Sequence, residues 1–209
     1  MSKPNRALIV VDVQQEYFSG PLEIQYPPRD QSLAQITRAI DVADEAGMPI
    51  VIVQHELPTE APVFGKGGAG WSLHSGIENK VKPEWKRVSK QYASVLEGTG
   101  LADWLREKNI DRVTLAGYMT NNCIIGTAVT AEPLGITVEV LSDATGAIHI
   151  ANAAGSIPAK QVHETLMAVL NSNFARVATT DSWVESVPTG ADLPGSDLGS
   201  SAMQGREEH

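Results

Sequence analysis

Three residues that lie far apart in the chain carry side chains that could together hydrolyse a small molecule. Asp12 interrupts an apolar run, Lys90 lies in the segment RVSKQYAS, and Cys123 is the only cysteine. A thiolate is a nucleophile, a carboxylate can accept and return its proton, and an ammonium group can orient that carboxylate. Each residue also has a simpler interpretation: a structural aspartate, a solvated surface lysine and a buried apolar cysteine.

The sequence around Cys123 predicts where such a nucleophile would sit. An apolar strand is predicted at Arg112 to Tyr118, a turn at 119–122, and a helix that begins close to Cys123. Free backbone N–H groups and the helix dipole at a helix start lower the pKa of a thiol. We therefore predict a reactive thiolate at Cys123.

The rest of the chain alternates strand-length apolar runs with helical patterns, which is typical of parallel βαβ units. Strands are predicted at 7–13, 49–55, 85–91, 112–118, 137–144 and 175–183, and helices at 32–47, 101–109, from 123 onward, and at 156–173. This order predicts an α/β fold with three α-β-α layers around a doubly wound, mostly parallel sheet of about six strands. Ligands bind such sheets beyond the carboxyl ends of the strands, where the strand order reverses. Asp12, His55, Cys123 and Asp143 would all lie at that edge.

A single catalytic domain is predicted for residues 1–186, followed by a tail at 187–209. Within the domain, residues 56–85 lack a sustained period and contain several glycines, so we predict that they form a lid. The tail is rich in Gly, Ser, Pro and charge. It is expected to be poorly ordered or to make subunit contacts.

Composition excludes several classes of partner. The 209 residues carry a formal net charge of −9 and the pI is about 5.0, which disfavours nucleic acid and anionic membrane surfaces as partners. One cysteine cannot form an intramolecular disulfide, which is compatible with a reducing compartment. Asp12 breaks the N-terminal apolar run, so neither a signal peptide nor a membrane span is predicted. We expect a cytoplasmic protein that acts on a small-molecule substrate.

Three separated motifs resemble those of a known family. They are ALIVVDVQQEYF, VSKQYASVLEGTGLADWL and TLAGYMTNNCIIGTAVTAEPLGITVEVLSDAT. In order and spacing they are similar to the isochorismatase-like cysteine hydrolases, a family that also includes nicotinamidases and N-carbamoylsarcosine amidases. The resemblance covers roughly residues 5 to 180.

The resemblance implies a role for each matching residue. Cys123 would be the nucleophile, Asp12 the general base, and Lys90 the cation that orients Asp12. A cis peptide bond is implied between Tyr118 and Met119, and the backbone N–H groups of Met119 and Cys123 would form an oxyanion hole. Family members are commonly homo-oligomeric, so a dimer or tetramer is expected.

Four residues near these motifs are candidate substrate contacts. Gln14 and Phe18 follow Asp12 closely, Trp71 lies in the predicted lid, and Tyr118 stands beside the Cys123 turn. Aromatic side chains in such loops serve as often in packing as in binding ligands.

No metal and no other cofactor is predicted. The nicotinamidase branch has a metal-binding Asp-x-His with a further histidine after its second strand, whereas this chain reads VIVQHELPTE and offers only His55 and the distant His74. We interpret His55 as a polar residue at a strand end or a substrate contact.

The resemblance favours a hydrolase that cleaves the C–N bond of a small amide or ureido compound through a thioester. The branch that hydrolyses the vinyl ether of isochorismate does not need the cysteine, so Cys123 favours C–N hydrolysis. Vinyl-ether hydrolysis remains an alternative. Another is a non-catalytic doubly wound domain that binds a small ligand, although no Gly-x-Gly-x-x-Gly follows the first strand.

Overall fold

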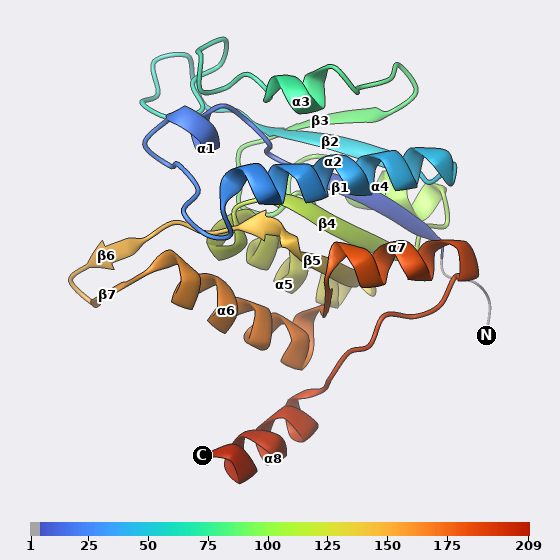
Figure 1. The fold of residues 1–209 in the computed structure, drawn as a ribbon. Coiled ribbons are helices and arrows are strands. Elements are labelled where there is room, and N and C mark those ends of the chain that lie inside the picture. The colour runs from blue at the N-terminus through green and yellow to red at the C-terminus, as the bar shows by residue number, and fades with distance from the viewer. Residues whose placement is uncertain (1–4) are drawn as a thin grey trace.

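A sheet of six parallel strands forms the centre of the protein, in the order β3-β2-β1-β4-β5-β8 (Figure 1). The computed structural model describes residues 5–209. The strands are β1 (Arg6–Val11), β2 (Ile50–His55), β3 (Lys86–Lys90), β4 (Arg112–Tyr118), β5 (Thr137–Gly146) and β8 (Arg176–Ala178). The predicted fold class and the parallel sheet are confirmed.

Helices cover both faces of this sheet. They are α1 (Glu16–Ser19), α2 (Arg29–Glu45), α3 (Ser75–Glu78), α4 (Leu101–Glu107), α5 (Ile125–Ala131), α6 (Ala159–Val169), α7 (Thr180–Thr189) and α8 (Leu198–Glu208), with a small hairpin of β6 (Ile150–Asn152) and β7 (Gly155–Ile157). Along β1, Leu8 and Val10 pack against α2 and α7, whereas Ile9 and its neighbours pack against α4 and α5. Every residue of β1 is buried, as expected for a strand covered on both faces. Among the described helices, none is both long enough and apolar enough to cross a membrane.

Several predicted boundaries differ from the structure by a few residues, and two of these differences have a clear local reason. The last strand ends at Ala178 and not at 183, because Thr179 caps α7 by accepting the N–H of Ser182 at 3.3 Å. Helix α6 begins at Ala159 and not at 156, because β7 pairs with β6 just before it.

Helix α8 lies in the tail, where no helix was predicted. Its glycines and serines have low helix propensity, which explains the omission. Asp197 caps the helix by accepting the N–H of Ser200 at 2.9 Å. Figure 1 shows α8 set apart from the body at the end of an extended segment. The tail is therefore helical in part, and its role in subunit contacts stays a prediction.

The strand order reverses between β1 and β4, and this point positions the candidate site. Asp12 directly follows β1, and Cys123 follows β4 by one turn. Gly117, near the end of β4, has a φ of 114°, and a Cβ there would lie 2.1 Å from the carbonyl oxygen of Val11. Only glycine lets the ends of β1 and β4 approach this closely.

Gly117→Ala should lower the free energy of unfolding by about 3 kcal/mol or more, because the new methyl group meets the β1 backbone and the φ is unfavourable. Gly135→Ala is the matched control, since Gly135 has a positive φ of 68° but nothing within 4 Å of a Cβ. That variant should lose only about 1 kcal/mol. Urea denaturation measures both, and equal losses would contradict the close-approach argument.

Candidate active site

A buried ion pair joins the ends of β1 and β3. Lys90 Nζ lies 2.7 Å from Asp12 Oδ2, and both side chains are completely buried. The same ammonium group donates to Cys123 Sγ at 3.2 Å and to the carbonyl oxygen of Tyr92 at 3.1 Å. The three residues singled out from the sequence therefore meet at one point.

Asp12 adopts an unusual backbone conformation that turns the chain out of β1. Its φ is 48°, in the left-handed region, and its N–H donates to the carbonyl oxygen of Val53 at 3.0 Å. Such a conformation costs about 1 to 2 kcal/mol in a residue other than glycine, and it is concentrated at functional sites. Asp12 Oδ1 has no hydrogen-bond partner among residues 5–209 and is free to accept a proton.

Cys123 lies in a single π-helical turn, Thr120–Ile124, that leads into α5. The peptide bond between Tyr118 and Met119 at its start is cis, as the resemblance implied. The carbonyl oxygen of Cys123 accepts the Thr127 hydroxyl at 2.7 Å, which ties the turn to the first residues of α5. The Cys123 side chain itself is buried.

The Cys123 thiol is protonated in this environment. Burial, and after it the negative charge of Asp12, raise its pKa to about 12, although Lys90 opposes the increase. The predicted resting thiolate is therefore wrong. One cation already faces one anion in this buried site, and a second anion would be left uncompensated.

Asp12 is better suited than an ordinary aspartate to take that proton. Burial raises its pKa, while Lys90 opposes the increase. Burial alone would lower the pKa of Lys90, but the charge of Asp12 and its hydrogen bond raise the pKa above its ordinary value. The arrangement is a neutral thiol beside an ion pair whose carboxylate is a strengthened base.

His55 completes the surroundings of Lys90. Its Nδ1 lies 2.9 Å from Lys90 Nζ, so Nδ1 carries no proton and accepts from the ammonium group. Burial, and after it the charge of Lys90, lower the pKa of His55 to about 4. His55 is therefore neutral near pH 7.

Asp12, His55 and Cys123 also form a set that could ligate a metal ion. Their ligand atoms all lie within 4.8 Å of one another, an arrangement that their wide spacing in the sequence conceals. Lys90 Nζ, however, is within 3.2 Å of an atom of each of them. The ammonium group thus takes the position that a metal ion would need, so the residues present do not fit a metal without displacement of Lys90.

A family model described as the isochorismatase domain matches residues 6–182. The chain belongs to the isochorismatase family. Among solved structures of this family, one from Burkholderia xenovorans LB400 is 42% identical, covers 99% of both chains and superposes with a TM-score of 0.95.

Several relatives in the family carry the names of hydrolases. Streptothricin hydrolase of Streptomyces noursei is 30% identical, over 92% of this chain and 71% of its own. Maleamate amidohydrolase of Pseudomonas putida is 26% identical, over 83% of this chain and 82% of its own. Their names show that this family includes enzymes that act on amides.

In this isochorismatase-family chain, Gln14 holds the predicted lid segment in place. Its Nε2 donates to the carbonyl oxygens of His55 at 3.0 Å and Trp71 at 2.7 Å, and its Oε1 accepts the N–H of His55 at 2.8 Å. Both amide hydrogens are therefore used. Gln14 therefore has no N–H left to donate to a ligand, and its contact with substrate stays a prediction.

The two predicted aromatic contacts next to the strands are packed into the core. The Tyr118 ring is buried, and its hydroxyl is hydrogen-bonded to Ser32 of α2 at 2.8 Å. Phe18 is partly buried and packs against His74, with ring centroids 4.2 Å apart. Trp71, by contrast, lines a hollow of about 160 Å³ that the predicted lid segment forms with Glu16, and it stays a candidate substrate contact.

Tyr17 is the aromatic residue that the sequence analysis missed. It is buried against Phe64 and Tyr118, with ring centroids 5.4 and 5.5 Å away. Burial raises the pKa of Tyr17 well above its ordinary value, so its hydroxyl keeps its proton. The adjacent aromatic residues Tyr17 and Phe18 indicated that an aromatic side chain lies near Asp12, but the sequence does not decide which of the two is buried beside the site.

Asp12→Asn should lower the pKa of Cys123, because it removes the nearby anion and leaves the Lys90 cation. The thiolate absorbance near 240 nm, measured against Cys123→Ala over a pH titration, reports this pKa. Asp143→Asn is the control, since Asp143 lies within β5 and its carboxylate accepts the N–H and the hydroxyl of Thr180. An unchanged or higher pKa in Asp12→Asn would contradict the electrostatic account.

Proposed function

We propose that the protein hydrolyses the C–N bond of a small amide or ureido compound through a thioester on Cys123. The observation that carries the proposal is the position of Lys90 Nζ, 2.7 Å from Asp12 and 3.2 Å from Cys123 in a buried site. Amide-hydrolysing relatives in the same family support it.

In the first step, the sulfur of Cys123 attacks the substrate carbonyl carbon while Asp12 accepts the thiol proton. The high pKa of the thiol makes this transfer simultaneous with attack, because a free thiolate is not formed beforehand. The oxyanion that results is held by the backbone N–H groups of Met119 and Cys123. Lys90 keeps Asp12 oriented and balances the negative charge.

In the second step, Asp12 returns the proton to the substrate nitrogen, and the C–N bond breaks. Ammonia or an amine leaves, and the acyl group remains on Cys123 as a thioester. Asp12 then takes a proton from a water molecule that attacks this thioester, which releases the acid and restores the thiol. The chain supplies every group that the cycle requires.

A panel of small amides and ureido compounds, assayed for release of ammonia or amine, tests the proposal. Asp12→Asn should retain the fold and lose about 10²- to 10⁴-fold in turnover, because an amide cannot accept the proton. Cys123→Ala should have no turnover, whereas Asp143→Asn should keep it. EDTA should have no effect.

Three outcomes would contradict this function. Turnover in Asp12→Asn within a few-fold of wild type would remove the general base. Turnover in Cys123→Ala would favour chemistry that needs no thiol, such as vinyl-ether hydrolysis. Loss on chelation, restored by zinc, would show that a metal displaces Lys90.

We also propose that the chain forms a homo-oligomer through α8. None of the residues of α8 is buried, and Leu198 and Met203 are 65% and 64% exposed. Isolated helices shorter than about 12 to 15 residues are marginal in water. The Burkholderia xenovorans structure nevertheless matches 99% of this chain, which includes part of this helix. A second copy of the chain is the partner that would cover it.

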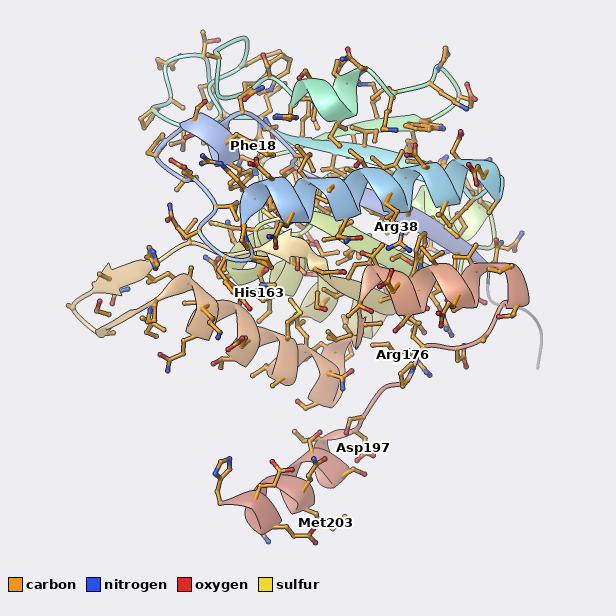
Figure 2. All side chains as sticks on the ribbon, viewed as in Figure 1. Phe18, Arg38, His163, Arg176, Asp197 and Met203 are labelled. Carbon is orange, nitrogen blue, oxygen red and sulfur yellow. The ribbon has the colours of Figure 1, made fainter. Side chains whose placement is uncertain are left out.

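Light scattering should give a multiple of the 22.3 kDa chain mass. Replacement of both Leu198 and Met203 by Asp should reduce that mass, because charges oppose burial of the exposed face (Figure 2). Replacement of the exposed Gln204 by Glu on the same helix is the control. A monomer at all working concentrations would contradict the proposal.

A further inference from the structure

A buried histidine is connected to the turn that carries Cys123. His163 Nδ1 lies 2.9 Å from the hydroxyl oxygen of Thr120, which begins the turn, and His163 Nε2 lies 3.0 Å from the carbonyl oxygen of Ser142. Thr120 is completely buried, and His163 is 3% exposed. Figure 2 shows His163 on the side of α6 that faces the body of the protein.

The chemistry of these three groups determines which atom donates in each of the two hydrogen bonds. The Ser142 carbonyl can only accept, so Nε2 of His163 carries the proton and Nδ1 does not. Burial lowers the pKa of His163, and the bond to Ser142 only partly offsets this, so the ring is neutral. The Thr120 hydroxyl therefore donates to Nδ1.

This chain of hydrogen bonds joins three elements. Ser142 belongs to β5, His163 to α6, and Thr120 to the turn between β4 and α5. The Tyr26 ring packs edge-on against His163 with centroids 5.6 Å apart, which restricts the imidazole further. Thr120 directly follows Met119 and lies three residues before Cys123, so its bond to His163 anchors the turn that carries both backbone N–H groups.

We propose that His163 is a positioning residue that acts through Thr120 to align the N–H groups of Met119 and Cys123. The inference rests on the proposed function, in which these groups hold the oxyanion. Donors in such a site must be fixed in advance to within a fraction of an ångström, and a displacement of about 1 Å can cost about 100-fold in rate. Neither His163 nor Thr120 contacts the substrate in this proposal.

Two substitutions separate the two hydrogen bonds of His163. The carbonyl oxygen of Asn can take the place of Nδ1, so His163→Asn keeps an acceptor for Thr120. His163→Gln can donate toward Ser142 but leaves Thr120 without its acceptor. Thr120→Val removes the hydroxyl with little change of shape and provides a second route to the same loss.

The probe is p-nitrophenyl acetate, whose acyl group is transferred to Cys123 with release of a burst of p-nitrophenolate. Iodoacetamide alkylation of Cys123 is the parallel measurement, because displacement of iodide at an sp³ carbon forms no oxyanion. Acylation should fall about 10- to 100-fold in His163→Gln and Thr120→Val, and by less than about 3-fold in His163→Asn. Alkylation should change by less than about 3-fold in all three. Cys123→Ala should show neither reaction.

Acylation of His163→Gln and Thr120→Val at the wild-type rate would overturn the inference. Equal losses in His163→Asn and His163→Gln would overturn it as well, since they would indicate that His163 only fills space. Parallel losses of acylation and alkylation would indicate damage to the fold or to access. A wild-type protein that is alkylated but not acylated would overturn the proposed function itself, and this inference with it.

Discussion

The buried ion pair between Asp12 and Lys90 is the interaction on which the rest of the site depends. Two charges can be removed from water only when each compensates the other, and loss of one partner typically costs about 3 to 5 kcal/mol. The pair requires β1 and β3 to end at the same edge of the sheet, on either side of β2. Burial sets the protonation of both neighbours and the charges of the pair modify it: Asp12 helps the Cys123 thiol to keep its proton, and Lys90 helps the His55 ring to stay neutral.

The protein positions this pair with backbone features and not with a large number of side chains. The left-handed turn at Asp12 directs the carboxylate inward, and Gly117 lets β4 approach β1 at the same level. Gln14 then joins β2 to the predicted lid through three hydrogen bonds. These features lie within six residues of one strand end or the other, so a short stretch of sequence at each end determines the geometry.

Much of this arrangement is predictable from the sequence, because apolar runs identify buried strands and strand ends identify the edge where Asp12 and Cys123 meet. The motif around Lys90 added the third residue. The state of the thiol was not predictable, since it depends on a carboxylate and on burial supplied by residues more than thirty positions away. The same applies to Gln14 and Tyr118, whose polar atoms are used by partners in other elements, and to α8, whose composition hides a helix.

The protonated, buried state of Cys123 bears on how readily the thiol is oxidised. Peroxides oxidise thiolates, and they do so fastest where the sulfur is exposed. A sulfur that is 1% exposed and has a pKa of about 12 offers them neither property. We therefore expect peroxides to oxidise Cys123 more slowly than they would oxidise an exposed, preformed thiolate.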